Sequence, residues 1–528
     1  MATPSAQRFR DALADALGAR SFDAGPRPLA LADAAIDDPS GRDGLPWRCV
    51  QTLEGPPLPL DDARLRRPPL EGRAIPSEGL RDEVGEAGHR LFSVGLEGGH
   101  VCLELPRFAN VDGFLEALMS VAAAARGAAL PALVLQGFPP PVDARVRCET
   151  ITPDPAVIEV NTAPATDVSA FLADQRAIHI AASAEGLAAR RLHFNGEETD
   201  SGGGGHLTFG ASEPLRSPFF RHRALLPRLL VYLNRHPSLS YYFGTHAGGS
   251  GQAPRADEGA RELVGELQLA LGRLRRSLET PREVDGWATR LWETLAPFCA
   301  DRFGNTHRAE VNLEKLWNPW LGTRGRLGVI ELRALRQAPT PEHAAARAAL
   351  FRAVLARLAT KPFDDGLVDW GPELLDRFAL PFFLRRDLED VLDDLARAGF
   401  GLGAPLVREL RDDGHRRLAS LELGALELEL RTAVEHPPLV GDLSKQAETT
   451  RLVDASTGRL ELAFHGPRGP VGRTRVAVVL PDDPVRRVEV PLVHVEDNRE
   501  RHALVCGIRY RRFRPKPGLH PDAPVLDP

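Results

Sequence analysis

The spacing of hydrophobic positions along the chain changes near Leu91. Upstream, residues 1–88 begin with one helical pattern and then become rich in proline, glycine and charge. Downstream, apolar side chains recur at every second position, as in strands, or at every third and fourth, as in helices. The strand-like stretches are residues 91–106, as a hairpin, and 132–137, 156–161, 190–196, 206–210, 306–316 and 326–335. The helical stretches are residues 111–128, 166–187, 221–235, 257–278, 282–300 and 340–399.

The C-terminal part of the chain returns to an almost continuous period of two. Its short apolar stretches are separated by glycine and proline, which is typical of a small β-sandwich. We therefore predict an α+β protein in three parts. A short N-terminal helix and extended segment covers residues 1–88, an α+β domain covers 89–415, and a β-sandwich-like domain covers 416–528.

Composition narrows the class of protein. The 528 residues are 43% hydrophobic, which suffices for a large buried core, and no stretch reaches the roughly 20 apolar residues of a membrane span. Without a signal peptide, we expect a soluble, cytoplasmic protein. The five cysteines form no Cys-x-x-Cys motif, which argues against a disulfide framework or a zinc ribbon. A net charge of −6 gives no general attraction to nucleic acid.

Polar side chains occur in pairs, two residues apart, on otherwise apolar predicted strands. Residues i and i+2 of a strand point to the same face. Charged side chains on an inward face are costly unless they are paired or bind a metal. Their recurrence indicates a functional site, and the alternative is exposed edge strands or structural ion pairs. The pairs are Glu159 with Asn161, Asn305 with His307, Arg308 with Glu310, and Glu331 with Arg333.

A glycine-rich stretch, NGEETDSGGGGHLTFG, covers residues 195–210 and joins four consecutive glycines to His206. It lacks the Gly-Lys-Ser/Thr ending of a P-loop, and the chain has no Gly-x-Gly-x-x-Gly between a strand and a helix. Bare backbone lets N–H groups approach an anion closely, and histidine is a common metal ligand. A phosphate-bearing ligand is therefore one interpretation, and a flexible hairpin connection is the other.

Seven motifs carry a resemblance to a known family. In chain order, ITPDPAVIEVN, SGGGGHLTFG, HPSLSYYFG, SGQAPRADEG, GNTHRAEVNLEKLW, GRLGVIELRA and WGPELLDRFALPFF resemble the bacterial amidoligase family. That family is similar to the glutamine synthetase-like carboxylate-amine ligases. The resemblance implies a glutamine synthetase-like catalytic domain with an antiparallel sheet and flanking helices. We identify the chain as a divergent member that lacks the N-terminal transglutaminase-like domain of many relatives.

The resemblance also implies which residues form the site. The metal ligands that it implies are Glu97, Glu159, His206 and Glu331. The expected nucleotide-binding residues are Gly202, Gly203, Gly204, Arg255 and Arg333, and the expected catalytic residues are Arg308, Glu310 and Arg333. Asp257, close to Arg255, suits the N-cap of the following helix as well as it suits a substrate contact.

The implied activity is an ATP-dependent ligation of a carboxylate to an amine, both small molecules or peptides, through an acyl phosphate. A carboxylate that attacks the γ-phosphate of ATP meets another anion. Cations such as Mg²⁺ or Mn²⁺ and clamping arginines are therefore needed to neutralise the developing charge. Neither nucleic acid nor a membrane is an expected partner.

Departures from the family pattern leave two alternatives open. Gly99 stands where a second carboxylate is expected on the first strand, Gly205 replaces an asparagine, and Glu198 replaces a histidine. One alternative is a phosphotransferase of the same fold. The other is a binding or scaffold protein without turnover, which works with a transglutaminase-like or ATP-grasp partner.

Overall fold

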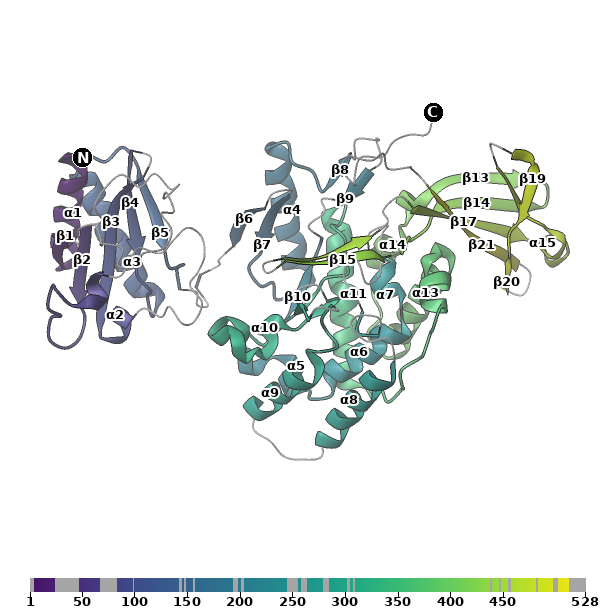
Figure 1. Ribbon diagram of the computed structural model, residues 1–528, viewed down its shortest axis with the longest axis horizontal. Helices are drawn as coiled ribbons and strands as arrows, with labels where there is room; N and C mark the ends of the chain where they lie inside the picture. Colours follow the sequence, from purple (N-terminus) through teal and green to yellow (C-terminus); the bar gives the residue numbers. More distant parts are fainter. Residues whose placement is uncertain are drawn as a thin grey trace. The chain divides into compact units, whose positions relative to one another are not determined.

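The computed structural model divides the chain into two compact units, Met1–Glu149 and Thr150–Pro528 (Figure 1). Each unit is described separately below. The residues that the structure describes are 4–23, 47–66, 83–97, 99–141, 145–146, 149–154, 157–192, 198–200, 204–244, 255–257, 264–278, 284–301, 304–306, 309–436, 439–445, 448–453, 457–480, 483–496 and 502–511.

The first unit is a five-stranded sheet with two long helices against one face and a short helix against the other. Its elements are α1 (Pro4–Leu17), β1 (Arg20–Asp23), β2 (Trp47–Thr52), α2 (Glu83–Glu86), β3 (His89–Glu97), β4 (His100–Leu105), α3 (Val111–Gly127) and β5 (Leu133–Gly137). The strand order is β1-β2-β3-β4-β5, antiparallel except for the parallel pair β4 and β5, which α3 connects. Buried side chains of α1 and α3 meet those of the sheet, among them Phe9, Phe92 and Leu103. Figure 1 shows α1 and α3 beside the strands of this sheet.

Two predictions for this unit can be compared with the sheet. The hairpin predicted at residues 91–106 is β3 and β4, and the strand and helix predicted after it are β5 and α3. Helix α3 begins where predicted because the Asn110 side chain accepts a hydrogen bond from the N–H of Gly113, at 2.9 Å. The predicted boundary between residues 88 and 89 lies between β2 and β3, which pair in one sheet.

The second unit begins with two hairpins and a helical body. Its first elements are β6 (Thr150–Asp154), β7 (Val157–Asn161), α4 (Val168–Ala184), β8 (Arg190–Leu192), β9 (Glu198–Asp200), β10 (Leu207–Phe209), α5 (Pro218–Arg221), α6 (Leu225–Arg235), α7 (Ser238–Tyr241), α8 (Val264–Ser277), α9 (Val284–Leu295), β11 (Val311–Asn312), α10 (Glu314–Trp317), β12 (Ile330–Leu332), α11 (Pro341–Thr360), α12 (Glu373–Asp376), α13 (Pro381–Arg397) and α14 (Ala404–Arg411). Strands β6 and β7 pair with each other, as do β8 and β9, and β10, β12 and β11 form a three-stranded sheet.

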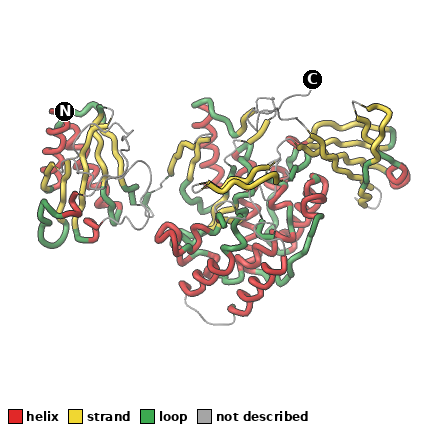
Figure 2. Tube along the Cα trace, viewed as in Figure 1, coloured by secondary structure: helices red, strands yellow, loops and turns green. Residues whose placement is uncertain are grey.

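The core of this body is built from helices and the three-stranded sheet. Apolar side chains of α6, α9, α11 and α13 pack together with those of β10, β11 and β12. Figure 2 shows the helices of this body in red. Helix α11 begins at a threonine cap, because Thr340 accepts a hydrogen bond from the N–H of His343 and Pro341 follows it. The short strands are therefore stabilised by burial of their apolar side chains against these helices.

One predicted strand is much shorter than expected. Of the strand predicted at residues 306–316, the described residues form a strand only at Val311–Asn312, and α10 begins at Glu314. The Oδ1 of Asn312 accepts a hydrogen bond from the N–H of Glu314, at 2.7 Å, and so turns the chain from strand into helix. The period-two pattern does not show this local turn.

The C-terminal part consists of an antiparallel sheet and two separate hairpins. Its elements are β13 (Arg417–Leu423), β14 (Leu426–Thr432), β15 (Leu439–Lys445), β16 (Glu448–Val453), β17 (Thr457–Gly466), α15 (Arg468–Arg473), β18 (Ala477–Leu480), β19 (Asp483–Glu489), β20 (Val493–Glu496) and β21 (His502–Arg511). The five-stranded sheet has the order β13-β14-β17-β21-β20, and β15 pairs with β16 and β18 with β19. The period-two alternation correctly predicted strands here.

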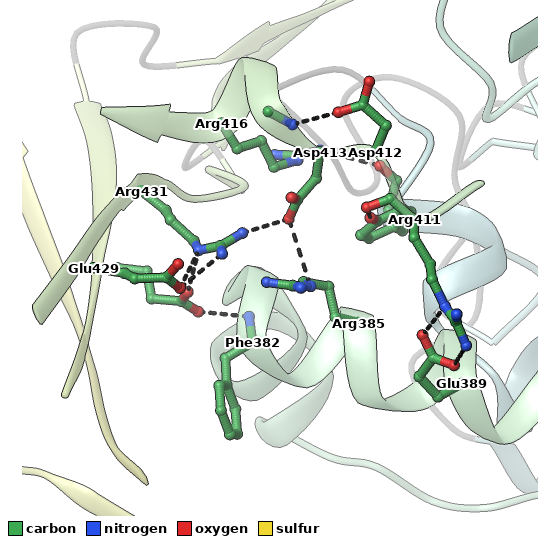
Figure 3. A network of polar contacts seen from close by, with 12 residues as sticks. Phe382, Arg385, Glu389, Arg411, Asp412, Asp413, Arg416, Glu429 and Arg431 are labelled. Carbon is green, nitrogen blue, oxygen red and sulfur yellow. Dashed lines mark hydrogen bonds and ion pairs between the residues drawn. The ribbon is translucent and has the colours of Figure 1, made fainter. Parts of the chain in front are cut away.

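Buried ionic contacts join this sheet to the helical body. Arg431 on β14 donates to Asp413, just before β13, at 2.5 Å, and to Glu429 on its own strand at 2.7 Å (Figure 3). Glu461 on β17 accepts the N–H of Phe382 in the first turn of α13, at 2.7 Å. The sheet is therefore held to α13 by a carboxylate that caps the helix.

The architecture confirms the predicted α+β class, with antiparallel sheets and flanking helices. Within the described ranges, none of the helices combines the length and the apolar character that crossing a membrane requires.

Candidate functional site

Glu331 lies at the centre of the three-stranded sheet. On β12 it is opposite Thr208 of β10 and Asn312 of β11. Because successive strand residues point to opposite faces, one face of this sheet is polar and the other apolar. The polar face carries Glu331 and its two neighbours. The row on the apolar face is buried in the core and consists of Leu207, Leu332 and Val311.

Three donors surround the Glu331 carboxylate. The Nδ1 of His206 lies 3.1 Å from Oε1, and the Nη1 of Arg333 donates to the same oxygen at 3.0 Å. The Nδ2 of Asn312 donates to Oε2 at 3.2 Å. Burial alone raises the carboxyl pKa, but the His206 hydrogen bond and the Arg333 charge outweigh it and lower the pKa of Glu331 to about 2. Glu331 is therefore ionised at neutral pH.

The end of the glycine run shapes this site. Gly204 has a φ of 85°, and a Cβ at that position would lie 2.5 Å from the Nε2 of His206. At Gly205 a Cβ would lie 2.5 Å from the carbonyl oxygen of Arg336, and its N–H donates to Leu335 at 2.9 Å. These two glycines let the loop pass closely under the imidazole and along the segment after β12. Gly202 and Gly203 lie outside the described residues.

A second polar cluster, centred on Arg255, is buried. Arg255 and Asp257 form a bidentate ion pair with two contacts of 2.9 Å. The guanidinium also donates to the Oγ of Ser240, at 2.6 Å, and to the carbonyl oxygens of Leu233 and Asn234. The anionic partner of Arg255 in this structure is the side chain of Asp257, and the predicted part of Arg255 in nucleotide binding stays a prediction. The Arg255 side chain is 1% exposed.

Glu310 joins that cluster to the sheet. Its carbonyl oxygen accepts the N–H of Arg333 at 2.8 Å, next to the paired residues of β11 and β12. Its side chain is buried, and burial raises the pKa of Glu310, although the charge of Arg255 and a hydrogen bond with Ser240 oppose this. The pKa of Glu310 is therefore shifted upward, in the direction opposite to that of Glu331.

Glu159 lies on a different sheet from Glu331. It is exposed on β7, which pairs only with β6 among the described strands. The Nδ2 of Asn161 donates to its Oε1 at 2.8 Å, so the predicted same-face pair is present. The pair of Glu331 and Arg333 is present as well, in contact at 3.0 Å. Both contacts follow from the period-two rule.

Of the other predicted site residues, one belongs to the first unit and one lies outside the described residues. Glu97 is the last residue of β3 in the first unit, at the end of the β3–β4 hairpin, where Gly99 has a φ of 81°. This left-handed conformation favours glycine at the turn. Arg308 lies outside the described residues. The parts of Glu97 and Arg308 in a site stay predictions.

The described residues offer a partial fit to a divalent cation. Among them, no three His, Cys, Asp or Glu side chains are grouped so that they could hold a metal ion. The pair of His206 and Glu331 supplies one imidazole and one ionised carboxylate in contact. Carboxylate oxygen is the ligand type that Mg²⁺ and Mn²⁺ prefer, and a neighbouring arginine is a natural partner for phosphate. The cluster can therefore supply part of a metal and phosphate site.

Sequence reasoning missed two residues of these clusters, Asn312 and Ser240. Asn312 follows Glu310 by two residues, so the spacing rule that singled out Glu310 also applies to it. Ser240 lies in a stretch of apolar and aromatic residues, HPSLSYYF, and no spacing relates it to Arg255. Only the tertiary structure brings Ser240 to the buried ion pair.

Comparison with known protein families gives one match. Residues 74–528 match the model of a family described as "Putative amidoligase enzyme (DUF2126)". No match was found among curated proteins or among solved structures.

Proposed function

Because the chain belongs to this amidoligase family, we propose that it is an ATP-dependent carboxylate-amine ligase. In the proposed reaction, a carboxylate oxygen of one substrate attacks the γ-phosphorus of ATP, and ADP leaves. The amine of the second substrate then attacks the acyl carbon, inorganic phosphate leaves, and the nitrogen loses a proton. The product is an amide or peptide bond.

The observation that carries the proposal is the position of Glu331 between His206 and Arg333 on the middle strand. A phosphoryl-transfer site needs an anionic ligand for a cation and a cationic donor for phosphate within reach of each other. Here both lie on one polar face, and all three side chains remain partly exposed, at 17% for Glu331, 24% for His206 and 18% for Arg333. Solvent exposure of this kind leaves room for a ligand to approach.

Each residue of the cluster has a proposed role. Glu331 and His206 would hold Mg²⁺ or Mn²⁺, and the cation when bound would offset the charge of the ATP phosphates. Arg333 would bind the transferred phosphoryl group. Gly204 keeps the loop close under His206, so that the imidazole stays beside Glu331.

Other predicted residues have supporting parts in the proposal. Glu97 and Glu159 are proposed as further cation ligands, and Arg308 as a further phosphate contact. Glu310 is proposed as a catalytic residue in the buried cluster beside the sheet. Arg255 is proposed to support that cluster, since its donors already serve Asp257, Ser240 and two carbonyl oxygens.

One observation favours a second candidate, a binding or scaffold protein without turnover. The described residues do not bring three metal-ligating acidic, cysteine or histidine side chains together, and Arg333 already neutralises Glu331. A protein that had lost catalysis would keep the fold and the Glu331 ion pair for stability. It would neither bind ATP in a magnesium-dependent way nor consume it.

Calorimetry of ATP binding with and without Mg²⁺ separates the two candidates. The test variant is Glu331→Gln, which removes the charge and keeps the shape. The matched control is Glu389→Gln, because Glu389 also forms a close pair with an arginine, Arg411, but on the surface. We expect magnesium-dependent ATP binding by the unaltered protein and the control, weakened at least about tenfold, or ~1.4 kcal/mol, in Glu331→Gln.

One result would contradict the role proposed for Glu331, and another would contradict the ligase proposal itself. Equal magnesium-dependent binding by Glu331→Gln and the unaltered protein would exclude Glu331 as a cation ligand. Absence of ATP binding by all three proteins would favour the scaffold.

A further inference from the structure

Asn312 uses both ends of its side-chain amide. It is 3% exposed and lies on β11 directly opposite Glu331. Its Oδ1 accepts the N–H of Glu314, at 2.7 Å, and its Nδ2 donates to the Oε2 of Glu331, at 3.2 Å. Each polar group of this buried side chain therefore has a partner.

These two contacts fix the orientation of the amide. The backbone N–H of Glu314 is a donor, so it requires the amide oxygen on that side. The NH₂ group must then face Glu331. A flipped amide would place an NH₂ against an N–H and an oxygen against a carboxylate, and both contacts would be repulsive. The strand-to-helix turn at the end of β11 thus dictates which group Asn312 presents to Glu331.

The orientation of Asn312 divides the two carboxylate oxygens of Glu331 between different tasks. Oε2 is bound by Asn312, whose side chain is buried. Oε1 faces His206 and Arg333, whose side chains are partly exposed. A carboxylate held at one oxygen has much less freedom to rotate, so the other oxygen stays directed at its partners.

We infer that Asn312 is a positioning residue that holds Glu331 with Oε1 directed toward His206 and Arg333, where the cation and the phosphate would bind. This inference rests on the proposed function for its significance in catalysis. The hydrogen bonds of Asn312 do not depend on that proposed function.

The test combines crystal structures of variants with calorimetry of ATP binding. Asn312→Ala removes the donor to Glu331. The matched control is Asn318→Ala, because Asn318 is also buried and caps a backbone N–H, that of Trp320 at 2.9 Å, without a recorded contact to Glu331. We expect the carboxylate of Glu331 to leave its contact with His206 in Asn312→Ala and to keep it in the control. We also expect magnesium-dependent ATP binding to weaken about tenfold in Asn312→Ala only.

Asn312→Asp provides a second variant if Asn312→Ala does not fold. It keeps the oxygen that accepts the N–H of Glu314 and replaces the donor by an anionic oxygen. We expect Glu331 to turn away from this like charge.

The possible outcomes separate this inference from the proposed function. Glu331 in an unchanged position in the Asn312 variants overturns the inference, whether or not ATP binds. A displaced Glu331 in a protein whose unaltered form binds no ATP overturns the proposed function, and the positioning role stands. Weakened binding with a displaced Glu331 supports both.

Discussion

Glu331 and Glu461 both lie on inner strands of antiparallel sheets with an arginine nearby, yet their carboxyl pKa values move in opposite directions. Burial raises the pKa of both groups. At Glu331, hydrogen bonds and charge from His206 and Arg333 reverse the effect and bring the pKa to about 2. Glu461 is fully buried. Among the described residues its carboxyl group accepts one hydrogen bond, from the N–H of Phe382, and burial raises its pKa to about 7.

The difference shows that a nearby arginine does not by itself keep a buried carboxylate ionised. The Nε of Arg431 lies 4.0 Å from Glu461, but its guanidinium is already bound to Asp413 and Glu429 (Figure 3). Arg333 donates directly to Glu331 at 3.0 Å. The charge state of a buried carboxyl group depends on donors that contact it directly and are not already bound to other carboxylates. Glu331 is therefore suited to bind a cation, whereas Glu461 is suited to anchor a sheet on a helix.

The largest expected effect concerns Glu461 and pH. Its folded-state pKa of about 7 is above the ordinary value of 4.5, so the folded state binds more protons between these values. The contribution of Glu461 to the free energy of unfolding is therefore largest below about pH 4.5. It falls by up to ~3 kcal/mol as the pH rises through 7. Glu461→Gln removes this proton linkage. We expect chemical unfolding at a series of pH values to show a flatter profile for the variant.

The control for this prediction is Glu389→Gln, which removes a carboxylate from an exposed ion pair, and such pairs contribute little to stability. A Glu461→Gln variant with the same pH profile as the unaltered protein would show that Glu461 is ionised in the folded state. The contrast with Glu331 would then be lost.

A smaller effect is expected at Gly204, and Gly186 offers a matched control. Both glycines have left-handed φ values, 85° and 72°, but a Cβ at Gly204 meets His206 and a Cβ at Gly186 meets nothing within 4 Å. We expect Gly204→Ala and Gly186→Ala each to lose about 1 kcal/mol of stability from backbone strain. Only Gly204→Ala should also weaken magnesium-dependent ATP binding, because the displaced imidazole leaves Glu331.

Calorimetry and thermal unfolding of these two variants sharpen the comparison of the two carboxylates. Equal ATP binding by both glycine variants would mean that the contact between His206 and Glu331 has no part in binding. Equal losses of both stability and binding would point to a general disturbance of the fold.

Much of the fold follows from sequence periodicity, because local patterns dominate long elements. The helix at Val168–Ala184 and the hairpin of β3 and β4 lie where the spacing predicts them. The short β11 does not, because a single side chain, Asn312, ends the strand through a hydrogen bond to the next helix. Such a local contact leaves no periodic signal.

The candidate site was predictable in part. Strand geometry predicted that Glu331 and Arg333 share a face, and the glycine run pointed to His206. Sequence could not show that Ser240 contacts Arg255, because only tertiary packing brings Ser240 to the ion pair of Arg255 and Asp257. Nor could it show that Glu159 lies on a separate hairpin, because strand pairing is a long-range property.

The most direct test of the central claim, that His206 and Glu331 hold the cation of a nucleotide complex, uses paramagnetic Mn²⁺ with ATP. The imidazole signals of protein with isotope-labelled histidine would be followed by NMR. His236 is the control, since it also contacts a carboxylate, that of Asp387, at 3.0 Å. We expect the His206 imidazole signals to broaden first and Glu331→Gln to abolish this broadening. Equal broadening of both histidines, or broadening that Glu331→Gln leaves unchanged, would contradict the claim.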